Sequence, residues 1–223
     1  ILVLLTSLLY PPFFMLPLGF IIFPSFIILI SNLSNQKSFL IFFFNGFLFG
    51  LGFLIIYLSW VHNPFLVYEA TKAYAFLALL LPVFLSIFFG LGFIIYKYLV
   101  LKLHIILITP FVFILIEFAI SNFIYGFPWI SNSLILSNNI TGFYLIKYLG
   151  TITSGYLILL LFLLPLMFSY FMSIKKYYKQ LLIVYSPLIL IFFLPILPFE
   201  SNSKKLNKEI VIEINQLVNP INS

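Results

Sequence analysis

The sequence predicts an all-α membrane protein, a bundle of about seven transmembrane helices followed by the first β-strand of a further domain. Two observations lead to this fold class. Of the 223 residues, 64% are hydrophobic and 7% are charged, and the mean hydropathy is +1.23. Such a chain has too little polar surface to cover a water-soluble globule. The apolar residues also form runs close to the roughly 20 residues that a helix needs to cross a bilayer.

The seven spans are placed on these runs, because a crossing segment must satisfy every backbone N–H and C=O within itself. In chain order they are 1–10, 13–30, 39–58, 73–96, 103–120, 143–172 and 181–197. The first is short and the sixth is longer than one crossing needs, so its ends stay open. Residue 1 is Ile, and we expect that a few leading residues of the natural protein are absent from this sequence.

Lysine placement predicts the orientation, since basic residues concentrate in short cytoplasmic connections. Alternate connections share this feature through Lys37, Lys97, Lys102, Lys175, Lys176 and Lys179. The opposite connections contain one clear lysine, Lys72, and Lys147 lies just beyond the last of them. The tail after Pro198 is therefore expected outside, in the periplasm of a Gram-negative cell. The net charge of +6 comes from lysines that lie at the ends of apolar runs, where they set the membrane orientation of the helices. We therefore expect no nucleic-acid partner.

The composition changes after Pro198. Residues 199–208 read as a polar linker, and Ile210, Ile212 and Ile214 then alternate with other residues at the period of a strand with one buried face. One strand cannot bury that face alone, so we expect a sheet-containing domain to begin here. The alternative is a disordered lysine-rich tail with incidental alternation.

The connection 121–132 is the most distinctive segment. Gly126 permits unusual backbone angles, Pro128 stiffens the turn, and Trp129 suits the headgroup level, where its ring is apolar and its N–H stays wet. Phe127 completes the block. From these residues alone, the segment is interpreted as a re-entrant or interfacial loop that anchors the bundle.

Two titratable residues are candidates for polar roles. Glu117 is the only acid inside a predicted span, about one turn from its outer end, so it should be protonated, hydrogen-bonded or facing a wet cavity. It either bonds a neighbouring helix or lies beneath an outward-facing lipid site. His62 lies at the outer end of the third span. No second ligand stands at a metal-binding spacing from it, so no metal and no cofactor are expected.

The sequence contains no cysteine, and so no thiol nucleophile. No Ser-His-Asp arrangement, phosphate loop or carboxylate pair is recognisable. We therefore assign no catalytic residue in this chain.

Several blocks together resemble bacterial apolipoprotein N-acyltransferase. In the same order and spacing they are 9–18, 46–53 running to Ser59-Trp60, Glu117-Phe118 and the Tyr-Gly-Phe-Pro-Trp block 125–129. Residues 206–216 are similar to the first strand of the family's nitrilase-like domain. The resemblance covers nearly the whole chain, and the Gly-Phe-Pro-Trp block is its most specific part. The family often continues the glutamate with Trp and Arg, where this chain has Phe118, Ala119 and Ile120, so a basic contact there is in doubt.

The resemblance implies a function. Family members move an acyl chain from a membrane phospholipid to the amino group of a diacylglyceryl-cysteine on an apolipoprotein, through a thioester on a cysteine assisted by Glu and Lys of the nitrilase-like domain. Thiolate attack followed by aminolysis is covalent catalysis. The resemblance thus implies a bacterial inner-membrane protein with a transmembrane domain at 1–198, a linker at 199–208 and the start of a truncated nitrilase-like domain at 209–223.

Under this interpretation the spans hold the missing domain and shape a lipid-accessible cleft with residues 126–129 at its rim. We expect these 223 residues alone to be inactive. Two alternatives stay open. One is a split-gene membrane subunit that recruits a separate nitrilase domain. The other is a small transporter or channel, which should have several polar residues facing one another within its spans.

Overall fold

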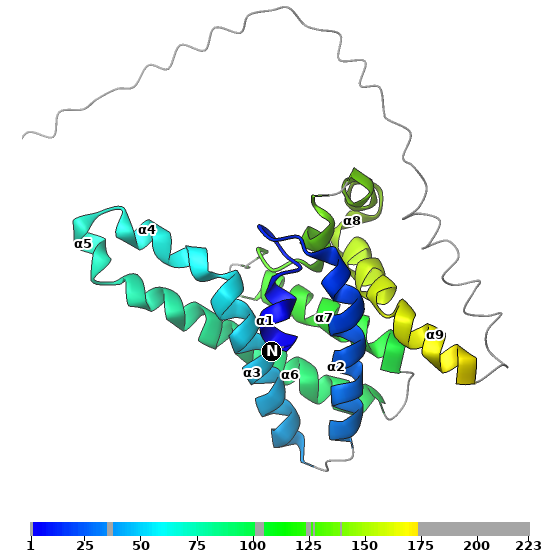
Figure 1. Ribbon diagram of the computed structural model, residues 1–223. Coiled ribbons are helices and arrows are strands. Elements are labelled where there is room, and N and C mark those ends of the chain that lie inside the picture. The colour runs from blue at the N-terminus through cyan, green and yellow to red at the C-terminus, as the bar shows by residue number, and fades with distance from the viewer. Residues whose placement is uncertain are drawn as a thin grey trace, which may run out of the picture.

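The computed structural model describes residues 2–34, 38–100, 105–123, 126, 128–138 and 140–173. Every regular element among them is a helix, and the longer helices form one bundle (Figure 1). The predicted seventh span 181–197, the linker 199–208 and the strand expected within 209–223 lie outside the described residues.

Four helices of the described part are long and apolar enough to cross a membrane. They are α3 (Phe39–Tyr57), α6 (Leu80–Val100) with the preceding 3-10 turn η3 (Ala75–Leu79), α7 (Ile105–Asn122) and α8 (Ile140–Phe162). The first three correspond to the spans predicted at 39–58, 73–96 and 103–120. The protein is therefore a helical membrane protein, as the composition predicts.

The first two predicted spans are shorter than expected. Helix α1 (Leu2–Ser7) has six residues and rises about 9 Å, far less than the roughly 30 Å hydrocarbon layer. Helix α2 (Gly19–Ser34) has 16 residues and follows the 3-10 turn η1 (Leu16–Leu18). Between them the backbone leaves the helical region, with φ of 51° at Phe14. Crossings by these segments, and hence a total of seven, are not confirmed.

The connection after α3 is a chain of short helical turns that projects from the bundle (Figure 1). These turns are η2 (Ser59–His62), α4 (Asn63–Leu66) and α5 (Glu69–Lys72). Glu69 and Lys72 form an exposed salt bridge there, worth at most a few tenths of a kcal/mol.

The long apolar run predicted at 143–172 is interrupted. Within α8, Gly150 has φ of 80° and ψ of 170°, outside the helical region, and a second helix, α9 (Leu164–Ser173), follows. Residues other than glycine rarely adopt such a φ, so the glycine at position 150 permits this break in the helix. The run is therefore longer than one crossing because its first part takes a different direction.

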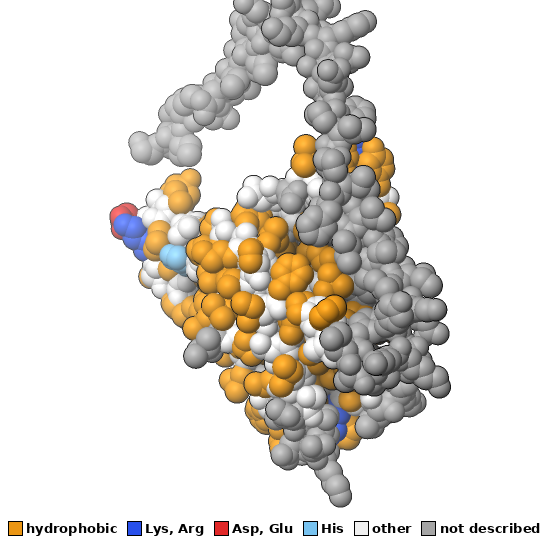
Figure 2. Space-filling view, turned by 45° about the vertical axis from the view of Figure 1, so that its right-hand side comes forward, with side chains coloured by type: hydrophobic (Ala, Val, Ile, Leu, Met, Phe, Trp, Pro, Cys, Tyr) orange, Lys and Arg blue, Asp and Glu red, His pale blue; other side chains and the backbone are white. Residues whose placement is uncertain are grey.

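The centre of the bundle is a cluster of phenylalanine rings. Phe26 of α2 lies with ring centroids 5.3 Å from Phe49 of α3, 5.6 Å from Phe93 of α6 and 5.4 Å from Phe113 of α7. Tilted and edge-to-face pairs of this kind are favourable beyond simple burial. Four helices thus meet on one aromatic core, while many apolar side chains face outward, as Figure 2 shows for one side of the molecule.

Helices α3 and α6 approach each other closely along glycines. A Cβ placed at Gly46 would lie 2.6 Å from the backbone oxygen of Phe89, and one at Gly50 would lie 2.7 Å from the side chain of the same residue. Small residues at such spacing allow membrane helices to pack without a gap.

Gly46→Val is therefore expected to destabilise the bundle. The atoms nearest to a Cβ at Gly46 include the backbone oxygen of Phe89, which cannot rotate away as a side chain can. Forcing extra atoms into such a well-packed contact costs about 1–3 kcal/mol. Thermal unfolding in detergent should show a lower midpoint. Leu48→Val on the same helix, where Leu48 is exposed, is the control and should unfold like the unchanged protein. Equal midpoints for both variants would contradict this packing.

Candidate functional site

Four parts of the chain meet at one end of the bundle: the end of α3, the end of α7, the turn after α1, and a segment made of residues 126 and 128–138. We call this end of the bundle the loop end. The segment begins at Gly126, whose φ is +75° and whose N–H donates to the Phe123 oxygen at 2.9 Å. A Cβ there would lie 2.5 Å from the Ser121 oxygen, so glycine is needed for the chain to turn back over α7.

Glu117 is buried beneath this segment, with 5% of its surface exposed. The Ser131 hydroxyl donates to Oε1 at 2.7 Å. The backbone N–H and the side-chain amide of Asn132 donate to Oε2 at 2.9 and 2.7 Å. The carboxyl group of Glu117 therefore accepts hydrogen bonds from three donors of the loop, and each such bond contributes about 1 kcal/mol.

Asn132 extends this network to the start of the chain. Its Oδ1 accepts a 2.7 Å hydrogen bond from the Tyr10 hydroxyl, and Tyr10 is itself buried. The Ser131 and Ser133 hydroxyls lie 2.9 Å apart. We call Tyr10, Glu117, Ser131 and Asn132 the loop anchor. It ties α7, the loop and the turn after α1 together, and no buried side-chain polar atom of the described residues lacks a partner.

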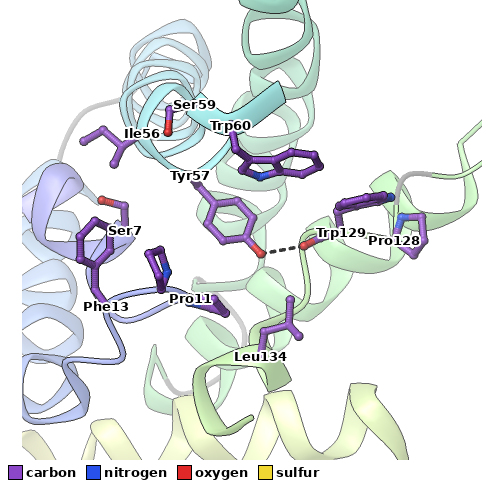
Figure 3. Close-up of a pocket in the computed structure, with 11 residues that line it drawn as sticks. Ser7, Pro11, Phe13, Ile56, Tyr57, Ser59, Trp60, Pro128, Trp129 and Leu134 are labelled. Atoms are coloured by element: carbon purple, nitrogen blue, oxygen red, sulfur yellow. Dashed lines mark hydrogen bonds between the residues drawn. The ribbon is translucent and has the colours of Figure 1, made fainter. Parts of the chain in front are cut away.

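Trp129 is held by contacts to the end of α3. Its ring stacks on Trp60, with centroids 4.7 Å apart and an angle of 26° between the planes. Its backbone oxygen accepts a 2.7 Å hydrogen bond from the Tyr57 hydroxyl, drawn as a dashed line in Figure 3. The two tryptophans of the chain thus meet across 69 residues of sequence (129 − 60).

A pocket of about 810 Å³ opens between these parts. Side chains of three segments surround it in Figure 3: the turn after α1, the end of α3 with η2, and the loop. The lining residues are Ser7, Pro11, Pro12, Phe13, Ile56, Tyr57, Ser59, Trp60, Pro128, Trp129 and Leu134. The lining is apolar and aromatic with a few hydroxyls, and the volume is within the range of about 300–1,000 Å³ found for small-molecule sites.

The residues that the sequence singled out do not all meet here. Pro128 and Trp129 line the pocket, and Gly126 sets the turn that leads to them. Phe127 lies outside the described residues. Glu117 lies behind the loop, beside a separate gap of about 10 Å³. His62 is exposed, and its Nδ1 contacts the Ser59 oxygen of its own turn.

No charged side chain lines the pocket, and the described residues contain no group of three His, Cys, Asp or Glu side chains placed to hold a metal ion. A mostly apolar lining with a few polar groups is typical of small-molecule binding sites.

Sequence reasoning did not identify Tyr10, Tyr57 or Asn132 as site residues. Tyr10 and Tyr57 lie within apolar runs and read as ordinary interfacial or core aromatics. Asn132 lies in the distinctive loop, but its partners are 15 and 122 residues away. The one available signal for the stacked pair was that Trp60 lies at the outer end of the third predicted span and Trp129 in the outer connection 121–132.

Tyr57→Phe is expected to loosen the loop slightly. It removes the hydroxyl that bonds the Trp129 oxygen and keeps the ring, and a hydrogen bond of this kind contributes about 1 kcal/mol. Acrylamide quenching of tryptophan fluorescence should increase. Tyr68→Phe, at an exposed position between α4 and α5, is the matched control and should leave quenching unchanged. Equal quenching in both variants would argue against this tie.

Comparison with known proteins gives a clear assignment. Residues 3–164 match the family described as "Apolipoprotein N-acyltransferase N-terminal domain". A search of curated proteins found no match. The matched range runs from the second residue of α1 to the end of α8 and includes every residue of the loop anchor and the pocket.

Proposed function

Because this chain belongs to the apolipoprotein N-acyltransferase family, of which it carries the membrane part, we propose that its loop-end pocket receives an acyl chain of the donor phospholipid. The acyl chain is destined for the N-terminal diacylglyceryl-cysteine of a lipoprotein. The observation that carries the proposal is the apolar pocket beside the Trp60–Trp129 stack, at an end of a membrane bundle.

Two features support a lipid as the occupant. The walls are aromatic and aliphatic side chains with hydroxyls of Ser7, Tyr57 and Ser59 between them, which suits an acyl chain with an ester near its end. Interfacial tryptophans also lie at the depth where lipid esters are found. Glu117 serves as a positioning residue, because its three hydrogen bonds hold the loop that forms one wall.

Orientation is part of the proposal. The loop end faces the periplasm of a bacterial inner membrane, and the tail after Pro198 is on the same side. Lys97 supports this orientation: it lies near the far end of α6, and its Nζ is 4.3 Å from the ring centroid of Phe39 at the start of α3. Lysines favour the cytoplasmic side.

A photoactivatable phospholipid with a diazirine in its acyl chain tests the pocket. In purified protein in vesicles, crosslinks should fall on Ile56, Trp129 and Leu134. Leu134→Trp fills the pocket and should reduce those crosslinks severalfold, whereas Leu107→Trp, at an exposed position on α7, should not. Crosslinks spread evenly over outward-facing residues in all three proteins would refute the assignment.

The acyl transfer itself needs a nucleophile that these 223 residues do not contain, since they include no cysteine. A protein made of these residues alone is expected not to restore lipoprotein triacylation in cells depleted of the enzyme. Co-expression with a separately encoded nitrilase-like domain would restore it if the chain works as a split subunit. Restoration by the 223 residues alone would refute the proposal that the nucleophile lies outside them.

A further inference from the structure

The first ten residues of α8, 140–149, have two different faces. The face toward η4 (Asn132–Leu136) includes the buried residues Thr141, Gly142 and Leu145. The other face follows the helical spacing i, i+3, i+4, i+7, i+8. It is made of Ile140, Phe143, Tyr144, Lys147 and Tyr148, which we call the outer stripe.

Gly142 sets the direction of the outer stripe. A Cβ at this position would lie 2.2 Å from the backbone oxygen of Leu136, so the helix lies directly on η4. With one face held this closely, the stripe points away from the protein, and Phe143 and Tyr148 are 59% and 69% exposed.

Gly150 separates this segment from the part of the chain that crosses the membrane. Its φ of 80° breaks the helix, and the helical residues after it lead through the turn at Leu163 into α9. Met167 N–H bonds the Leu163 oxygen at 3.0 Å across that turn. Residues 151–173 therefore provide the roughly 20 residues of a crossing. Figure 1 shows the beginning of α8 in a different direction from the later part.

The outer stripe has the composition of a membrane–water interface. Tyr144 and Tyr148 stack with centroids 6.1 Å apart, and the Lys147 Nζ lies 5.4 Å from the Tyr148 ring centroid. The one salt bridge among the described residues joins Lys72 and Glu69, so Lys147 takes no part in it. Tyrosine prefers the headgroup level, and lysine on such a helix attracts lipid phosphate.

We propose that residues 140–149 form an interfacial helix at the loop end, with the outer stripe at the boundary of headgroups and acyl chains and Lys147 on the phosphate of an anionic lipid. The aromatic rings enter the bilayer, while η4 supports the helix from the other side. This surface is separate from the pocket and does not depend on the acyl-transfer function, because it needs only a membrane-embedded chain.

The absence of cysteine from the 223 residues permits a direct test. Tyr148→Cys and Leu48→Cys each carry a single bimane label in phosphatidylcholine vesicles, and Leu48 is an exposed residue at the middle of α3. A nitroxide at headgroup level should quench the label at 148 strongly, and a nitroxide deep in the acyl chain should quench the label at 48 more. Quenching of residue 148 by aqueous iodide alone, or by neither reagent because protein covers it, would overturn the proposal.

A second measurement tests the lysine. With the label at 148, quenching by nitroxide-labelled phosphatidylglycerol should exceed quenching by nitroxide-labelled phosphatidylcholine. The difference should correspond to a roughly fivefold enrichment of phosphatidylglycerol beside the label. Lys147→Gln should remove the preference, and Lys72→Gln should keep it. Thermal unfolding midpoints of both variants should equal that of the parent, which separates lipid contact from folding. An unchanged preference in Lys147→Gln would refute the phosphate contact.

Discussion

Glu117→Ala is expected to detach the loop 128–136 from α7 and to lower the unfolding midpoint more than any other single change considered above. The substitution leaves the Ser131 hydroxyl, the Asn132 N–H and the Asn132 amide without their acceptor in a buried place. Each unsatisfied buried group costs about 1–3 kcal/mol, so the total is roughly 3 kcal/mol or more. Thermal unfolding in detergent, followed by tryptophan fluorescence, measures the loss.

Two further variants sharpen this result. Glu117→Gln keeps the size and one accepting oxygen but turns an NH₂ group toward a donor, so its midpoint should fall between those of the parent and the alanine variant. Glu69→Ala removes the other described acid, which is exposed at the tip of the projecting turns, and should change little. If Glu117→Ala unfolds like Glu69→Ala, the loop anchor does not hold the loop.

Trp129→Ala is expected to weaken lipid capture at the loop end by about tenfold. The ring forms one wall of the pocket and stacks on Trp60, so its loss removes both a contact surface and the partner that orients Trp60. Loss of a large aromatic contact of about 1.4 kcal/mol corresponds to tenfold in affinity. The yield of pocket crosslinks as a function of phospholipid concentration in mixed micelles measures the change.

The control for this variant is another partly exposed aromatic. Phe123→Ala removes a ring that packs on Phe88, with centroids 5.0 Å apart, and that does not line the pocket. It should leave the concentration dependence unchanged. Trp129→Phe retains a stacking ring and should recover most of the binding. Equal weakening in the Phe123 and Trp129 variants would show that the effect is general destabilisation and not the pocket wall.

The helices that cross the membrane were predictable because their signal is local. A run of apolar residues between polar ends predicts a helix whatever its neighbours are, and α3, α6 and α7 follow that rule. The total of seven was a weaker prediction. The end of a helix cannot be read from a short apolar run such as α1 or from an overlong one such as 143–172. The helices break at Phe14 and Gly150 because of the backbone angles of these single residues.

The candidate site was predictable in part. The loop around Trp129 and the isolated acid Glu117 were recognisable as unusual, because an intramembrane carboxylate and an uncharged Ser- and Asn-rich connection both need an explanation. That Glu117 bonds this very loop was not predictable. The sequence interpretation considered a bond to a neighbouring helix, and the contact with residues 131 and 132 arises only after Gly126 turns the chain back.

By itself, the sequence determined that this protein lies in a membrane, that long apolar helices occupy 39–58, 73–96 and 103–120, which family it resembles and that these residues hold no thiol. These properties depend on composition and on short-range patterns, which act on each segment separately. The tertiary structure decided which side chains share a site. Tyr10, Tyr57, Trp60 and Trp129 come together because the rings of α2, α3, α6 and α7 pack on one core, which brings the helix ends that carry the site to a single place. Such packing depends on many contacts between residues that are far apart in the sequence, so no local sequence pattern predicts it.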